Sequence, residues 1–553
     1  MTTDGERLAL EQAIAQRQLE LEHYRRSGDR WHQATTLHEL GGLYQKLGQP
    51  GNALTSYEQA LSIFQQLGDF LGEVATLHNL GVLLKDKDPE RARASYEQAL
   101  TILRHHNDRR GQAFTLHNLG QLYESLGRDE QAKAAYQEAI AILQALGEPS
   151  NEAVPFINLG RLAERSERYD EARQYYQQAR QLLQQAGALK RELIAIKDLG
   201  RLAERQERYK EARRLYEEAC VLCRRLGYRE GEVGFLLSLA GVYHQSGQLL
   251  QARATYEQAL TLQAGSQDDP LSLFAIHLDL GGLLFMLALT ESARRHYEQA
   301  LTLARSNDLP PSCEDMSWNA LGQFFHYLGQ PVQAIDRYRR AFLSRARSGD
   351  ITGLILTLCS LGDLYGHFGQ LESGLAHLLE ARTIAEEEGD SATCASIDDR
   401  IASIRNQLGP EAFAFIRQIS ESERSLLIEA TIAGIISPEL SQQERIILPP
   451  EQLSPLIERI SLALADQSPP QERQALQSEL EHLRAQAQAQ SAPDETEQRA
   501  RAAAADFYAA LLALLEGEPA GLPAEHPYAL PLSLIQKGQT AWRASQIASN
   551  QQD

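Results

Sequence analysis

The sequence is poor in the features that mark membrane-spanning and disulfide-stabilised proteins. Across its 553 residues, no apolar run approaches the roughly 18 to 20 residues that a helix needs to cross a bilayer. Its first residues show no basic segment followed by an apolar core, the pattern of a secretory signal. Cysteine is scarce, odd in number and scattered, which excludes a disulfide framework; the five are Cys220, Cys223, Cys313, Cys359 and Cys394. We therefore expect a cytoplasmic protein that does not insert into membranes.

Sequence motifs of the common enzyme and metal sites are also absent. There is no Gly-x-x-x-x-Gly-Lys phosphate loop, no Gly-x-Ser-x-Gly nucleophile turn and no His-Glu-x-x-His zinc helix. Cys220 and Cys223 have a metal-like spacing, but no second pair of Cys or His follows at zinc spacing. The sequence predicts a protein without catalytic residues, metal ion or cofactor.

The charge balance lacks the basic excess of a nucleic-acid-binding protein. Acidic residues number 74 against 54 basic residues, which gives a net charge of −20. A chain of this charge repels a phosphate backbone, so we expect no nucleic-acid partner. Hydrophobic residues make up 43% of the chain and are mainly Leu and Ala, which favour helix. An all-α fold is the expectation.

What the sequence does have is a motif that recurs at a period of 39 to 41 residues. A small residue follows a leucine once in each period, and we call these residues the landmark glycines of repeats one to nine. They are Gly41, Gly81, Gly120, Gly160, Gly200, Ala240, Gly281, Gly322 and Gly362. A second landmark, an alanine that begins at Ala60 and Ala99, keeps the same period. Two landmarks in step predict a repeat architecture.

Each period reads as a pair of helices. In repeat one these span residues 31–47 and 49–67, and Leu37, Leu40 and Tyr44 fall on one helical face. Gly41 inside a helix costs about 1 kcal/mol relative to Ala, so its recurrence indicates a close approach by the partner helix. A single pair cannot bury both of its apolar faces, so neighbouring pairs must stack and the ends need caps.

The turn between repeats one and two is Gly68-Asp69. Glycine commonly ends a helix, and an aspartate that follows it can cap the next helix. We therefore predict that Asp69 is the N-cap of the first helix of repeat two.

These residues resemble the tetratricopeptide repeat. The matching positions are Leu37, Leu40, Gly41, Tyr44, Ala53, Tyr57 and Ala60 in repeat one, and Trp318, Leu321, Gly322, Phe325, Ala334, Tyr338 and Ala341 in repeat eight. The period is longer than the family's usual length of about 34 residues, and the late proline is absent. The variant is similar to the long repeats of kinesin light chains and of bacterial regulatory proteins. The resemblance implies a right-handed α-solenoid, a superhelix of about nine helix-turn-helix repeats.

Three regions follow from this pattern. Residues 1–30 form an N-terminal capping helix, residues 31–409 form the solenoid with a tenth first helix at its end, and residues 410–553 are helical with Pro-rich and Ala/Gln-rich linkers. In the last region Leu476, Leu480 and Leu483 share a face, which fits a surface helix or a short coiled coil. We expect this region to be a second contact surface or the contact with another copy of the chain.

The resemblance also implies where a ligand binds. In such proteins the first helices of successive repeats line a concave groove, and polar residues beside the Leu-Gly pair hold an extended peptide. The candidate peptide-binding residues are His38, His78, Asn79, His117, Asn118, Gln121, Asn158, Arg161, Arg165, Lys197, Arg201, Arg205, His244, Gln323 and His326. An Asn amide both donates to and accepts from a peptide backbone. The alternative is that the His and Asn side chains stay hydrated or bond to a neighbouring helix.

Four of these residues form a basic patch in an acidic chain. Arg161, Arg165, Arg201 and Arg205 repeat at the 40-residue period, and the planar guanidinium suits a carboxylate or phosphate. We expect an acidic peptide segment to bind there. The alternative is pairing within the chain, with Glu164 and Glu204 or with Glu167 and Glu207.

The sequence thus favours a non-catalytic adaptor or scaffold that binds a protein or peptide. A second interpretation is a sensor or regulatory subunit of a bacterial signalling or phage-defence system that controls a separate effector protein. A third, the least supported, is an enzyme whose site lies in residues 410–553, where no acid, base and nucleophile constellation is recognisable.

Overall fold

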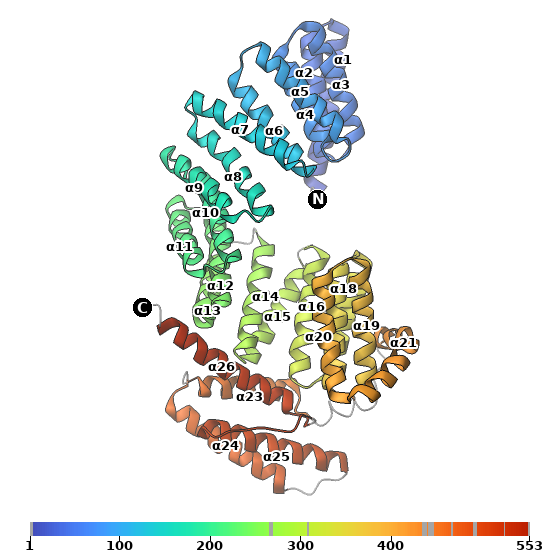
Figure 1. The fold of residues 1–553 in the computed structure, drawn as a ribbon, viewed down its shortest axis with the longest axis vertical. Helices are drawn as coiled ribbons and strands as arrows, with labels where there is room; N and C mark the ends of the chain where they lie inside the picture. The colour runs from blue at the N-terminus through green and yellow to red at the C-terminus, as the bar shows by residue number, and fades with distance from the viewer. Residues whose placement is uncertain are drawn as a thin grey trace. The chain divides into compact units, whose positions relative to one another are not determined.

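The computed structural model describes residues 4–264, 269–306, 309–433, 440, 447–465, 468–489, 495–524 and 526–550. These residues form helices and connecting turns, without a strand in the described part of the chain (Figure 1). The helices are α1 (Asp4–Ser27), α2 (Arg30–Lys46), α3 (Pro50–Leu67), α4 (Phe70–Leu84), α5 (Pro89–His105), α6 (Arg109–Ser125), α7 (Asp129–Leu146), α8 (Pro149–Arg165), α9 (Tyr169–Gln185), α10 (Leu189–Arg205), α11 (Tyr209–Leu226), α12 (Arg229–Gln245), α13 (Leu249–Gln263), α14 (Pro270–Met286), α15 (Thr290–Ser306), α16 (Pro311–Tyr327), α17 (Pro331–Ser348), α18 (Ile351–His367), α19 (Leu371–Glu387), α20 (Ser391–Leu408), α21 (Pro410–Ala433), α23 (Pro450–Leu464), α24 (Pro470–Ala489), α25 (Glu495–Glu516) and α26 (Ala529–Asn550).

The chain divides into two compact units. Unit 1 comprises Met1–Leu222 and unit 2 comprises Cys223–Asp553. Within each unit, a first helix packs against the second helix of its own repeat and against the preceding repeat, as in the series α6, α7 and α8. The predicted all-α solenoid of stacked helix pairs is confirmed.

The landmark glycines are small because a tyrosine ring lies on them. A Cβ atom built on Gly41 would stand 2.5 Å from Cε1 of Tyr57, and one built on Gly120 would stand 2.5 Å from Cε1 of Tyr136. The predicted close approach is therefore made by the tyrosine that the second helix contributes. Because both tyrosines are fully buried, the Gly–Tyr contact fixes the spacing of the two helices in each repeat.

The turns between repeats follow the predicted capping pattern. The Asp69 carboxylate accepts a hydrogen bond from the Gly72 amide at 3.2 Å, which confirms Asp69 as the N-cap of α4. Gly68 before it has φ +65°, a left-handed conformation that favours glycine. Asp29, Asp108, Asp350 and Asp390 cap α2, α6, α18 and α20 in the same way.

In unit 2 the C-terminal helices pack against repeats six to eight. The Trp542 indole N–H donates to the Leu287 carbonyl at 3.1 Å, and the Thr290 hydroxyl donates to the Ser454 carbonyl at 2.6 Å. Leu287 lies in the turn of repeat seven, where residues 285–289 are unusually apolar, and the last three of them are buried. Helices α23 and α26 therefore pack against the apolar turn and the helices that it joins, as Figure 1 shows.

The leucine face of the C-terminal region is buried within the chain. Leu476 and Leu480 are buried in α24, which packs against α25 and α23. The surface-helix interpretation of residues 471–490 fits the described residues 471–489, because the other positions of α24 are mostly exposed and its leucine face packs inward. Residue 490 lies outside the described residues.

Candidate functional site

We use the term first-helix face for the positions on either side of a landmark glycine, on α2, α4, α6, α8 and α10 in unit 1 and on α12, α14 and α16 in unit 2. Contacts between successive first helices pass through these positions, as between Arg161 on α8 and Asp198 on α10. This face contains the residues that the sequence predicts for peptide binding.

In repeats one and two the histidines of this face bond to the next first helix. His38 Nδ1 lies 3.0 Å from the Thr76 hydroxyl, and Asn79 Nδ2 lies 3.1 Å from His38 Nε2. The Thr76 hydroxyl donates its proton to the Gly72 carbonyl at 2.7 Å, so it accepts from a protonated His38 Nδ1. His78 Nε2 makes the equivalent contact with the Thr115 hydroxyl at 2.7 Å. The structure therefore shows the alternative role for His38, His78 and Asn79, in which the side chains hydrogen-bond to a neighbouring helix.

Burial favours the neutral form of these histidines. Burial lowers the pKa of His78 to about 4 and also lowers the pKa of His38 and His117. The series stops at His117, because Pro155 stands where Thr76 and Thr115 stand in the two preceding repeats. Among the described residues no group bonds to His117 Nδ1, which is buried.

The polar residues near His117 are less constrained. Asn118 is partly buried and has no hydrogen-bond partner among the described residues, while Gln121 is exposed. Asn158 is buried beside the hydroxyl of Tyr136. Lys197 on α10 is exposed. The exposed Phe114 and Ile194 stand six positions before their landmark glycines, so apolar surface accompanies the amides.

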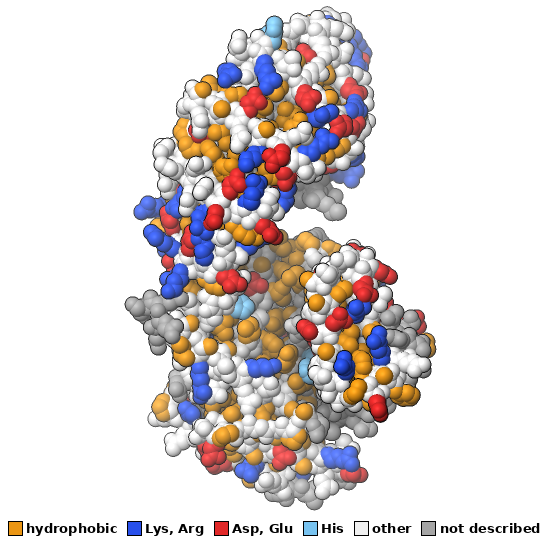
Figure 2. All heavy atoms as spheres, in the orientation of Figure 1, with side chains coloured by type: hydrophobic (Ala, Val, Ile, Leu, Met, Phe, Trp, Pro, Cys, Tyr) orange, Lys and Arg blue, Asp and Glu red, His pale blue; other side chains and the backbone are white. Residues whose placement is uncertain are grey.

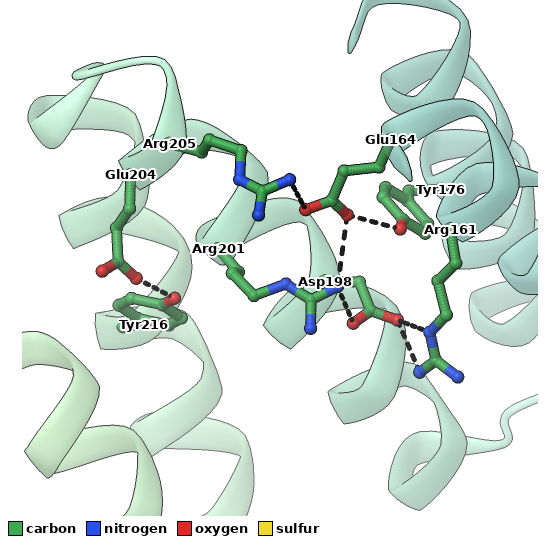
Figure 3. A network of polar contacts seen from close by, with 8 residues as sticks. All are labelled: Arg161, Glu164, Tyr176, Asp198, Arg201, Glu204, Arg205 and Tyr216. Carbon is green, nitrogen blue, oxygen red and sulfur yellow. Dashed lines mark hydrogen bonds and ion pairs between the residues drawn. The ribbon is translucent and has the colours of Figure 1, made fainter. Parts of the chain in front are cut away.

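The four arginines of the basic patch are held by carboxylates of the chain, and Figure 3 shows three of them, Arg161, Arg201 and Arg205. Arg161 binds Asp198 Oδ2 through Nε at 3.1 Å and Nη2 at 2.8 Å. Arg201 lies 3.2 Å from Glu164 and 3.3 Å from Asp198, and Arg205 lies 3.4 Å from Glu164.

Arg165 has two carboxylate partners in the preceding repeat. It lies 2.5 Å from Asp129 and 3.7 Å from Glu124. The pairing of Arg201 and Arg205 with Glu164 matches the alternative that the sequence left open. Glu204 instead accepts a hydrogen bond from the Tyr216 hydroxyl. The partners Asp198, Asp129 and Glu124 were missed, although Asp198 follows Arg161 by 37 residues, close to one period.

Asp198 and Glu164 are buried, whereas the four arginines are about half exposed. The Asp198 side chain is 3% exposed, whereas those of Arg161 and Arg201 are 45% and 51% exposed. Burial raises the pKa of Asp198, and the two guanidinium groups oppose this shift. Glu164 also accepts a hydrogen bond of 2.9 Å from the Tyr176 hydroxyl. The buried acids thus fix the guanidinium groups while one side of each stays open to solvent.

In unit 2 the first-helix face borders a pocket of about 550 Å³. The pocket includes the predicted residues His244 and Gln323, while His326 is buried and hydrogen-bonds to His367 at 2.8 Å. Burial lowers the pKa of His326 to about 3, and the neighbouring His367 adds to this shift. The other lining residues are Tyr256, Leu278, Asp279, Gly282, Leu283, Phe285, Met286, Tyr297, Tyr327, Leu534, Lys537 and Ala541. Figure 2 shows hydrophobic side chains gathered in the hollow over α14.

Sequence reasoning missed most of this pocket. Asp279 stands two positions before its landmark glycine, as Asn79 and Asn118 do, so the repeat pattern could have pointed to it. Lys537 could not be found in this way, because α26 lies outside the periodic region. Among the described residues no group of three or more His, Cys, Asp or Glu side chains is placed to hold a metal ion. No described helix is long and apolar enough to span a membrane.

The repeat pattern now has an independent match. The family model described as Tetratricopeptide repeat matches residues 32–105, 73–145, 151–225 and 234–306. This chain is a tetratricopeptide repeat protein. A model described as Anaphase-promoting complex subunit 5 matches residues 315–407. No curated protein matches the sequence significantly.

Solved structures of other tetratricopeptide repeat arrays are similar to parts of this chain. BtubC from P. vanneervenii is 22% identical, with 40% of this chain and 92% of that chain covered and a TM-score of 0.36. The apo quorum sensor NprR from B. thuringiensis is 16% identical, with coverage of 66% and 98% and a TM-score of 0.43. Aspartyl phosphate phosphatase F from Bacillus subtilis is 13% identical, with coverage of 64% and 93% and a TM-score of 0.41.

Proposed function

We propose that this tetratricopeptide repeat protein is a non-catalytic, cytoplasmic adaptor or regulatory protein, and that the first-helix face of unit 1 binds an extended segment of a partner protein. The segment contacts Asn118 and Gln121 through its backbone and Phe114 through an apolar side chain. An acidic side chain of the segment binds Arg161 and Arg201. The amides supply donors and acceptors that tolerate many sequences, and the arginines supply a charge preference.

The observation that carries this proposal is the way Asp198 positions two arginines. Arg161 uses Nε and Nη2 for Asp198, and a guanidinium has further N–H donors on Nη1. An external carboxylate therefore binds from the solvent side without displacing Asp198. Because the buried acid already restricts the arginine side chains, binding loses less conformational entropy than it would with mobile arginines.

The test compares two pairs of arginines. The partner is purified from native cells on the wild-type chain, and its affinity is then measured for Arg161→Gln with Arg201→Gln. We expect a loss of about tenfold or more, equal to about 1.4 kcal/mol. The control is Arg91→Gln with Arg104→Gln, two second-helix arginines that each pair with a glutamate at 2.8 and 2.7 Å.

A second variant keeps the ion pairs intact. Asn118→Ala removes an amide that has no partner among the described residues, so the fold is expected to be unchanged. It should also weaken partner binding. Unchanged affinity in both the arginine pair and Asn118→Ala, with a native circular dichroism spectrum, would contradict the proposal.

A further inference from the structure

Asp279 in repeat seven is the equivalent of Asp198 in repeat five, but it lacks the cations. Both stand two positions before the landmark glycine. Asp198 is paired with Arg161, one position after the landmark of the preceding repeat, and with Arg201, one position after its own. The residues at these two positions around Asp279 are Gly241 and Gly282. A carboxylate is present in both repeats, and its counter-ions are present in one.

The two glycines leave space where the arginine side chains would be. A Cβ atom on Gly241 would have no neighbour within 4 Å, and one on Gly282 would meet the Tyr297 hydroxyl oxygen at 3.8 Å. Gly282 and Asp279 both line the pocket of about 550 Å³ in unit 2. This volume lies within the range of about 300 to 1,000 Å³ that is typical of small-molecule sites.

Asp279 has no counter-ion within the described chain. The structure gives it no ion pair with any described Lys, Arg or His. Unlike Asp198, the Asp279 residue is exposed, and partial burial of its carboxylate raises its pKa. Lys537 also lines the pocket, but its ammonium group lies over the Tyr327 ring, 5.2 Å from the ring centre. The Asp279 carboxylate lines the pocket, is accessible from solvent and is thus available to an incoming cation.

The rest of the pocket suits a cation on an apolar body. In repeats three to five the tyrosine hydroxyls donate to Glu124, Glu164 and Glu204. Repeats six and seven have His244 and Phe285 at this position, and among the described residues the hydroxyls of Tyr256 and Tyr297 have no acceptor. Aromatic rings attract organic cations through their faces. Leu278, Leu283 and Met286 add apolar wall.

Helix α26 closes one side of the pocket. It contributes Leu534, Lys537 and Ala541, and the Trp542 hydrogen bond to Leu287 anchors it at 3.1 Å. Gly538 allows this close approach, since a Cβ atom there would stand 2.7 Å from the Ala288 Cβ atom. The site is thus built jointly by the repeats and the C-terminal region.

We propose that this pocket binds a small organic cation, an amine or guanidine carried on an apolar body. Its charged group lies against Asp279, in the space that Gly241 and Gly282 leave, and its apolar body packs on Phe285 and Met286. This site is separate from the peptide surface proposed for unit 1. A ligand held between the repeats and α26 gives the protein the means to sense a small molecule.

The test uses a charged probe and its neutral analogue on the full chain. Binding of 4-phenylbutylamine and of 4-phenylbutan-1-ol is measured by isothermal titration calorimetry. We expect the amine to bind at least about tenfold more tightly than the alcohol, because only the amine gains the carboxylate. Asp279→Asn should abolish this preference. Equal binding of the two probes to the wild type, a preference that persists in Asp279→Asn, or no amine binding up to about 1 mM would overturn the proposal.

A substitution that supplies the cation internally sharpens the test. Gly241→Arg places a guanidinium where Arg161 stands relative to Asp198 and should prevent amine binding. The matched control is Gly234→Arg on the same helix, where a Cβ atom also has no neighbour within 4 Å but which does not occupy the position equivalent to Arg161. Equal loss in both variants would contradict the assignment to Asp279.

A third probe tests whether the pocket prefers a cation carried on a peptide to one carried on a small molecule. Blocked Ala-Arg-Ala carries a guanidinium on a peptide rather than on a small apolar body. We expect it to bind more weakly than 4-phenylbutylamine. Tighter binding of the peptide through Asp279 would overturn the assignment of the pocket to a small molecule.

Discussion

Repeats three to five of unit 1 and repeats six to eight of unit 2 share one packing scheme and differ in the chemistry of the first-helix face. A tyrosine ring lies on the landmark residue in both stretches, as Tyr136 does on Gly120 and Tyr297 on Gly281. Over α8 to α10 Figure 2 shows acidic and basic side chains intermixed, whereas hydrophobic side chains gather over α14. The packing positions therefore set the fold, and the positions beside them set what each stretch can bind.

The same difference appears at the aspartate that stands two positions before the landmark glycine in repeats five and seven. Asp198 is enclosed by Arg161 and Arg201, so unit 1 meets the charge requirement of its buried carboxylate within the chain. Asp279 has glycines at the equivalent positions and opens into a pocket. A position that is structural in one repeat becomes available to a ligand in another when its partners change to glycine.

The C-terminal helices make the second difference. Repeats six to eight are covered by α23 and α26, whose residues share one hydrophobic cluster with those repeats. Substituting Trp542, whose indole attaches α26 to the repeats, should reduce stability more than the other substitutions proposed here. Trp542→Ala deletes a buried indole and its hydrogen bond, and we expect a loss of about 3 to 5 kcal/mol in the local stability of unit 2.

Hydrogen exchange followed by mass spectrometry measures this loss by region. Protection should fall over residues 529–550 and over the turn of repeat seven, while α6 to α9 stay unchanged. The matched control is Trp31→Ala in unit 1, because the Trp31 indole donates to Asp69 at 2.9 Å but is exposed. Equal effects of the two substitutions would contradict the anchoring role of Trp542.

A smaller effect on stability should distinguish Asp198 from Asp279. Asp198→Asn leaves Arg161 and Arg201 without their carboxylate, and we expect a loss of about 1 to 2 kcal/mol. Asp279→Asn removes a charge that has no counter-ion among the described residues, so no loss is expected. Thermal unfolding monitored by regional hydrogen exchange compares them. Equal destabilisation by both substitutions would show that Asp279 has a stabilising partner.

The sequence predicted the repeated helix pairs because packing in each repeat is local. Gly41, Tyr57 and Ala60 recur at fixed offsets, and each contact joins neighbouring helices, so the period alone determines the hairpins and their order. The N-cap at Asp69 was predicted for the same reason.

The arrangement of the candidate site was less predictable. The roles of His38 and His78 depend on Thr76 and Thr115 one repeat later, and the sequence alone left those roles open. The contact of α26 with Leu287 joins residues 255 positions apart. No period relates them, so the closed pocket could not be predicted from the repeat pattern, although the apolar turn at residues 285–289 was visible.

In unit 1 two arginines neutralise the buried Asp198 carboxylate, whereas in unit 2 we propose that the Asp279 carboxylate is available to a cationic ligand. Carbon-detected NMR titration of the Asp198 and Asp279 carboxyl groups, with and without 4-phenylbutylamine, tests it most directly. Burial raises the pKa of Asp279 in the free protein, and a bound cation favours the ionised form, so the amine should lower that pKa. By linkage, amine binding should strengthen as pH rises through this pKa. The pKa of Asp198 should not change. A pKa of Asp279 that does not respond to the amine, or an equal response at Asp198, would contradict the account.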